Sequence, residues 1–131
     1  MIISMSNHQN IAELKKKVDF GLKFWLQVEG NSILGKGWAR LLESISNDQI
    51  KSLSKAAEKC NYSYKYAWNI LKRIEKRTGM SPVITHKGGT GGGGTVELNE
   101  WGNFLLMVYN SMLEEVNNLK KNLEQKIKKL Y

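Results

Sequence analysis

The pattern of hydrophobic and polar positions divides the chain into segments with different periods. From Asp19 to Ile33 the hydrophobic residues fall on alternate positions, which is typical of a half-buried strand. Turn-forming residues at 29–31, followed by an apolar run at 32–34, predict a hairpin with a short return strand. The polar segment 1–18 is expected to be a loosely held arm or a short helix. The alternating residues are Phe20, Leu22, Phe24, Leu26 and Val28.

Three helices are predicted next, because hydrophobic residues recur at spacings of three and four. The first runs from about Trp38 to Ile45. The second covers residues 50–60 with Ser52 or Ser54 as its cap, and Asn61 after it tolerates the left-handed backbone of a tight turn. Ser63 is expected to cap the third helix, which continues to about Thr78. The expected apolar stripe of this third helix is Tyr64, Ala67, Trp68, Leu71 and Ile74.

The last part of the chain predicts a second hairpin and a long helix. Residues 82–86 and 95–98 read as strands joined by a glycine-rich tip at 87–94. From Asn99 onward a helix is expected, with a nearly heptad-spaced apolar seam that a small domain cannot bury on its own core. We therefore expect this helix to pair with a partner chain. The seam residues are Tyr109, Met112, Val116, Leu119, Leu123, Ile127 and Leu130.

This order of elements predicts an α+β, mostly α, fold of the winged helix-turn-helix type. A two-helix unit with a tight turn precedes a basic helix and a glycine-tipped hairpin, the wing. We expect an N-terminal arm at 1–18, a DNA-binding domain at 19–98 with an N-terminal β-hairpin, and a C-terminal dimerisation helix at 99–131. A chain of 131 residues has room for one such small domain.

The charge is concentrated in the middle of the chain. Twenty Lys and Arg against 12 Asp and Glu give a net charge of +8. Residues 51–87 contain nine of the positive side chains and two negative ones, so this stretch alone carries +7. A basic surplus attracts polyanions, and its concentration around the predicted basic helix favours nucleic acid.

The polar face of the third helix has the side chains that read DNA. Lys65, Asn69 and Arg73 repeat at i, i+4 and i+8, and Asn and Arg can pair with base edges in a major groove. Lysines at 72 and 76 would flank this row toward phosphates, and the glycines of the wing would permit close approach to the backbone. The predicted DNA-binding residues are Ser54, Lys55, Ser63, Lys65, Tyr66, Asn69, Lys72, Arg73, Lys76, Lys87, Gly88, Gly89 and Thr90.

Catalysis and cofactor binding are not favoured by the residues present. The glycine run 89–94 formally satisfies G-x-G-x-x-G, but a strand follows it where a dinucleotide fold needs a helix. Two histidines and one cysteine show no convincing metal or nucleophile spacing. We therefore expect no enzymatic activity, no cofactor and no metal. The longest apolar run, 104–109, is too short to span a membrane, and with a single cysteine we expect a cytoplasmic protein.

Three other functions stay open at the level of sequence. An architectural, chromatin-like protein would coat DNA through charge with little sequence choice. An interaction module would recruit a partner through the long helix, with the basic face incidental. Single-stranded RNA binding is less favoured, because no aromatic sheet platform is predicted. No small-molecule effector can be assigned.

Four stretches of the chain also carry a family resemblance. The segments 25–30, 34–42, 63–68 and 88–94 resemble the N-terminal DNA-binding domain of ModE-type molybdenum-dependent transcription regulators, over about residues 20–115. The resemblance implies a winged-helix homodimer on an operator, with Ser63, Lys65 and their neighbours facing DNA and the final helix joining subunits. Asn61 stands where the family usually has glycine. Only 33 residues follow Leu98, so we expect no molybdate-binding domain here.

Overall fold

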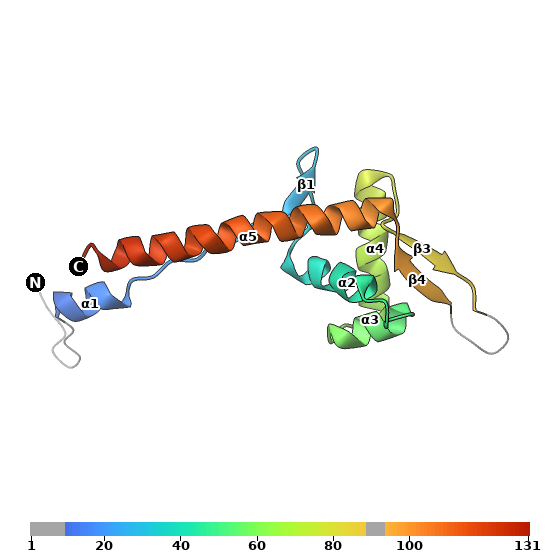
Figure 1. Ribbon diagram of the computed structural model, residues 1–131, viewed down its shortest axis with the longest axis horizontal. Helices are drawn as coiled ribbons and strands as arrows, with labels where there is room; N and C mark the ends of the chain where they lie inside the picture. The colour runs from blue at the N-terminus through green and yellow to red at the C-terminus, as the bar shows by residue number, and fades with distance from the viewer. Residues whose placement is uncertain (1–9, 89–93) are drawn as a thin grey trace, which may run out of the picture. The chain divides into compact units, whose positions relative to one another are not determined.

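The computed structural model describes residues 10–88 and 94–131, and within them the chain is α+β and mostly helical (Figure 1). The elements form two units, which are residues 24–112 and the two terminal segments 1–23 and 113–131. The described helices are α1 (Ile11–Lys17), α2 (Lys36–Ser46), α3 (Leu53–Lys59), α4 (Tyr64–Thr78) and α5 (Glu100–Lys128). The described strands are β1 (Leu26–Val28), β2 (Asn31–Leu34), β3 (Val83–His86) and β4 (Thr95–Leu98).

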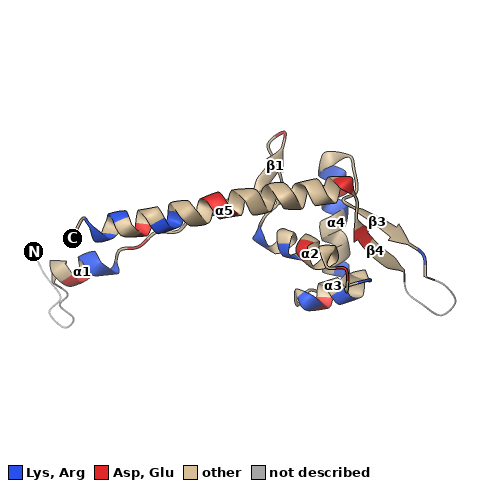
Figure 2. Ribbon diagram, viewed as in Figure 1, with Lys and Arg blue, Asp and Glu red and all other residues tan. Residues whose placement is uncertain are grey.

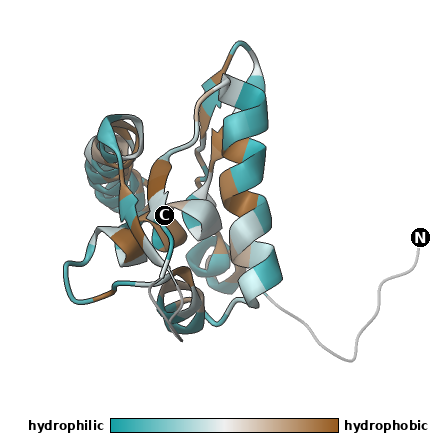
Figure 3. Ribbon diagram, turned by 90° about the vertical axis from the view of Figure 1, so that its right-hand side faces the viewer, coloured by the Kyte–Doolittle hydropathy of each residue, from teal (hydrophilic) through white to brown (hydrophobic). Residues whose placement is uncertain are grey.

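The core of the larger unit lies where α2, α3 and α4 pack together, with β2 against α4 and β4 against α2. Each helix contributes the residues that its three- and four-residue spacing places on one side, and Figure 3 shows hydrophobic and hydrophilic residues alternating along the helices. The buried helical residues include Leu41, Leu42, Ala56, Ala67 and Ile74, all with exposed fractions of 0%. The described residues bury no polar or charged side chain in this core.

Each hairpin is a two-stranded antiparallel sheet. The β1–β2 turn consists of Glu29 and Gly30, both with positive φ, a combination that matches the twist of a two-residue hairpin. In the β3–β4 pair, Val83 lies opposite Leu98 and His86 opposite Thr95. The amide of Val96 also donates to the carbonyl of Lys51 at 3.2 Å, so β4 is tied to the segment that precedes α3.

The predicted strand over 19–33 is wrong at its beginning. The chain has no regular structure from Val18 to Trp25, and only Leu26–Val28 pairs with a partner strand. The return strand is four residues long, so it can satisfy the backbone of only a short opposite segment. Phe24 lies outside the strand, and its ring stacks on Tyr109 with ring centroids 4.8 Å apart. This contact explains why position 24 is hydrophobic although no partner strand pairs with it.

The predicted apolar stripe of α4 is partly wrong. Ala67, Leu71 and Ile74 are buried, but Tyr64 is 55% exposed and Trp68 is 38% exposed. Ile70, which the stripe left out, is 1% exposed. The helix carries two adjoining apolar rows, and the core packs against the row that contains Ile70. Trp68 is therefore a surface residue and not a core anchor.

Two residues of the predicted seam on the last helix also need correction. Tyr109 is 5% exposed and packs in the core of its own unit, so it is not available for a partner in this structure. Leu130 lies beyond the end of α5. The predicted N-terminal arm contains α1, a short helix without buried residues. No helix in the described part of the chain is long and apolar enough to cross a membrane.

Candidate nucleic-acid interface

Helix α4 has a buried side and an exposed basic side. Ala67, Ile70, Leu71 and Ile74 face the core. The residues predicted to read DNA lie on the other side of the helix, because their spacing of three and four keeps them in one row. All six are exposed: Lys65, Tyr66, Asn69, Lys72, Arg73 and Lys76. Figure 2 shows Lys and Arg positions in blue along α4.

The start of α4 is fixed by the turn that joins it to α3. Asn61 has φ 59°, the left-handed conformation that its short amide side chain tolerates. The amide of Tyr62 donates to the carbonyl of Ala57 at 2.9 Å, closing the end of α3. Ser63 then caps α4, its hydroxyl accepting from the amide of Tyr66 at 3.0 Å. Both predictions for this turn, the left-handed Asn61 and the Ser63 cap, are confirmed.

Tyr62 holds the turn against the start of α2. Its hydroxyl donates to the carbonyl of Gly37 at 2.9 Å, and its ring meets Tyr66 edge-on at 4.9 Å. Burial raises the pKa of the Tyr62 phenol, and Cys60 nearby raises it further. The phenol therefore stays a donor over the physiological pH range, and the first turn of α4 is held at two points.

The positive side chains of α4 are not equivalent. Lys72 pairs with Glu75 at 3.3 Å and lies over the Trp68 ring at 4.8 Å. Arg77 donates to the carbonyl of Ser32 and lies over the Trp38 ring, so it holds the first hairpin to α4. In the described part of the chain, Lys65, Arg73 and Lys76 make no ion pair. These three are the cations of α4 most available to a phosphate.

Helix α3 presents two more of the predicted residues. Ser54 and Lys55 are exposed, while Leu53, Ala56 and Ala57 face the core. The cap of this helix is Ser52, whose hydroxyl accepts from the amide of Lys55 at 3.1 Å. The sequence left Ser52 and Ser54 open as alternatives, and capping by Ser52 leaves the Ser54 hydroxyl at the surface.

The second hairpin supplies the base of the predicted wing. Lys87 and Gly88 are exposed beyond the end of β3, and the predicted contacts Gly89 and Thr90 lie outside the described residues. The side chains of His86 and Glu97 meet diagonally across the two strands, with Nε2 and Oε1 3.4 Å apart. A side chain at position 94 would collide with the carbonyl of His86, so glycine is required where the tip rejoins β4.

Asn99 joins this hairpin to α5. Its side-chain nitrogen donates to the carbonyl of Ser81 at 2.7 Å, and its oxygen accepts from the amide of Gly102 at 2.9 Å. The sequence left Asn99 and Glu100 open as caps of this helix, and the structure has Asn99 in that role. The same side chain holds the base of the β3–β4 hairpin to the first turn of α5.

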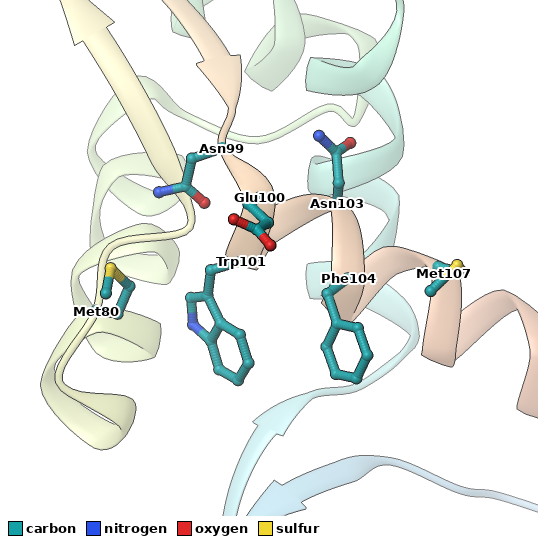
Figure 4. A pocket seen from close by; sticks show the side chains of 7 residues that line it. All are labelled: Met80, Asn99, Glu100, Trp101, Asn103, Phe104 and Met107. Carbon is teal, nitrogen blue, oxygen red and sulfur yellow. The ribbon is translucent and has the colours of Figure 1, made fainter.

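A pocket of about 790 Å³ at the start of α5 lies apart from these residues and was not predicted. Figure 4 shows the Trp101 and Phe104 rings pointing to the same side of α5, with Met80 and Met107 at its ends. The Trp101 indole nitrogen is buried and has no hydrogen-bond partner. The sequence signal that could have indicated this pocket is the pair of aromatic residues at 101 and 104, one helical turn apart. The described residues contain no group of three potential metal ligands among His, Cys, Asp and Glu.

No protein-family model matches the chain, and no curated protein is significantly similar to it in sequence. The chemistry of the site therefore comes from its residues alone. One amide and three unpaired cations on a helix face, beside a hairpin that carries a lysine, can donate hydrogen bonds to phosphates and base edges.

Proposed function

We propose that the chain is a sequence-specific, double-stranded DNA-binding transcription regulator of the winged helix-turn-helix type. In this proposal α4 enters the major groove and the β3–β4 wing contacts the flanking backbone. The observation that carries it is the exposed row of Lys65, Asn69, Arg73 and Lys76 on the face of α4 opposite the core. Such a row combines phosphate attraction with two side chains that can pair with base edges.

The arrangement around α4 supports the same function. Helix α3 and the turn at 60–63 precede α4, and a hairpin with an exposed lysine follows it, which is the order of elements in winged helix-turn-helix proteins. The resemblance to ModE-type regulators over about residues 20–115 leads to the same proposal, including a homodimer joined through α5. A two-fold dimer would read a two-fold related operator in the cytoplasm. We propose no catalytic activity and no cofactor.

Fragments bound from the organism's genomic DNA would supply the operator for a direct test. We expect the selected duplex to outcompete random duplex by a factor of about 10³ or more. Competition close to unity would instead indicate an architectural protein that coats DNA by charge. Absence of duplex binding at low salt would favour an interaction module and overturn the proposal.

Variants of the α4 row and the wing separate reading from attraction. We expect Asn69→Ala or Arg73→Ala to weaken operator binding by about 1–3 kcal/mol and to relax the sequence preference. Lys87→Ala should weaken operator and random duplex alike and lower the salt slope by about one unit. Fluorescence anisotropy over a salt series measures both quantities. Unchanged affinity in all three variants would contradict the proposed interface.

A further inference from the structure

The C-terminal part of α5 carries a short apolar seam that its own chain covers only in part. The seam residues Met112, Val116, Leu119 and Leu123 are spaced by four, three and four, the heptad spacing of two paired helices. Met112 is 43% and Leu119 is 48% exposed, while Val116 and Leu123 are half-buried. Large apolar side chains left open in a regular row are typical of an interaction surface.

Both ends of this seam are set by neighbouring residues. Tyr109, one step before Met112, is buried in the core of its own unit. A strict heptad places Lys126 at the next position after Leu123, where it cannot be buried in an apolar pair without cost, and Ile127 of the predicted seam lies one residue out of register. The surface offered to a partner is therefore limited to about residues 112–123, which is less than four turns of helix.

The charges beside the seam distinguish the possible orientations of a partner helix. With Val116 and Leu123 at heptad positions a, Glu115 occupies position g and Lys120 position e. In a parallel, in-register pair, each g residue lies beside the e residue of the following heptad on the partner, so opposite charges meet twice. In an antiparallel pair with the two seams fully overlapped, e faces e and g faces g, so Lys120 would lie beside the partner's Leu113 and Glu115 beside the partner's Asn122. No opposite charges would meet in that arrangement.

We propose that the α5 seam binds the α5 seam of a second copy, parallel and in register, with Glu115 paired to the partner's Lys120. This inference rests on the homodimer of the proposed function and specifies its geometry. Within a parallel assembly, valine at a (Val116) followed by leucine at d (Leu119) favours two strands over three or four. Neither Glu115 nor Lys120 has an ion-pair partner within the described part of its own chain, so both are available.

Because the seam is short, we expect the dimer to be weak. Two heptads bury little apolar surface, so the pair forms and separates with protein concentration. When two copies bind adjoining half-sites of one duplex, the DNA raises the effective concentration of one seam near the other and so strengthens their pairing. Free protein should therefore be a mixture of monomer and dimer, whereas protein on a two-fold operator should be a dimer.

Charge reversal tests the orientation in the absence of DNA. Glu115→Lys should weaken dimerisation about tenfold in sedimentation equilibrium, because two attractive pairs become repulsive. The double variant Glu115→Lys, Lys120→Glu should restore wild-type association. Glu114→Lys and Lys121→Glu change the same charges on the face away from the seam and are the matched controls. Failure of the double variant to restore association would overturn the parallel pair.

Disulfide trapping gives a second test that does not depend on salt. In a Cys60→Ala background, Met112→Cys should form a covalent dimer on mild oxidation, because identical positions meet in a parallel pair. Ser111→Cys, one residue away from the seam, should not. Trapping only in a mixture of Met112→Cys and Leu123→Cys chains would indicate antiparallel pairing and contradict the proposal. DNA binding of these variants, measured separately, reports on the α4 interface.

Discussion

Helices α4 and α5 both contribute to the core, but they differ in the residues that stay exposed. Each packs one side against the core of the larger unit through buried residues such as Ile74 on α4 and Leu105 on α5. The remaining side of α4 carries exposed lysine, arginine and asparagine, whereas the continuation of α5 carries exposed leucine and methionine. The surface that the core does not use is thus polar and basic on α4, whereas on α5 it includes an apolar row among polar and charged residues.

This difference indicates what each helix binds. A basic face gains little from an apolar partner and much from a polyanion, because released counterions supply the favourable free energy. An apolar seam gains little from DNA and much from a second apolar seam. On this comparison we propose a nucleic-acid face on α4 and a self-association face on α5, and each can be changed without the other.

The largest expected effect is on the free energy of unfolding, which should respond strongly to a core residue of α4 and weakly to a seam residue of α5. Ile74→Ala should lower the free energy of unfolding by about 2–5 kcal/mol, because it opens a cavity at a fully buried position. Leu119→Ala should change it much less in dilute solution. Thermal unfolding across a range of protein concentrations measures both. A wild-type midpoint independent of concentration would contradict the role of Leu119.

A smaller loss is expected where α5 touches the base of the second hairpin. Gly102 lies in the first turn of α5, and a side chain there would collide with the carbonyl of Pro82 and press on Leu98. Gly102→Ala should destabilise by about 1–3 kcal/mol, although alanine favours helix more than glycine does. Gly21→Ala, at a position with open space, is the control. Equal stability of the two variants in urea unfolding would show that the contact is not restrictive.

Ser63 allows stability and DNA binding to be separated at one position. Ser63→Ala should cost about 1 kcal/mol of unfolding free energy, because the Tyr66 amide loses its cap. Ser63→Asp keeps a capping oxygen and should retain stability, but its negative charge should weaken duplex binding. Asn10→Asp makes the same charge change at the cap of α1. Equal weakening by both aspartates would contradict a local role for the start of α4.

The smallest expected effect is a pH dependence at the α3–α4 turn. Burial raises the Tyr62 pKa above its ordinary value of 10.0, so the folded state holds the phenol proton more tightly than the unfolded state. This contribution is present below pH 10 and is lost as pH rises through the folded-state pKa. Tyr62→Phe should therefore show a shallower loss of stability above pH 10 in chemical denaturation. An unchanged slope would contradict the buried phenol.

The helices could be predicted from the sequence because their signals are local. The caps at Ser52 and Ser63 and the left-handed Asn61 follow from hydrogen bonding within a few residues. The stripe of α4 could not be assigned in the same way. Its two adjoining apolar rows are equally periodic, and only packing against α3 and β2 selects the row with Ile70 over Trp68.

The candidate site was predicted as a set of exposed residues, but its internal pairing was not. Nothing in the local sequence distinguishes Arg73, which makes no ion pair among the described residues, from Arg77, which bonds to Ser32 from 45 positions away. The prediction of a strand over 19–25 was wrong for a related reason. Alternation shows that one face is hydrophobic and the other polar, but it does not show whether a neighbouring strand is there to pair with. Long-range partners decided both cases.

The central claim is that α4, and not the net charge of the chain, binds DNA. Lys65, Arg73 and Lys76 changed together to glutamine remove three charges from α4, and the same change at Lys121, Lys128 and Lys129 removes three from the C-terminal end. Duplex affinity measured over a salt series should lose about two to three units of slope in the first variant and keep the wild-type slope in the second. An equal loss of slope in both variants would contradict the claim.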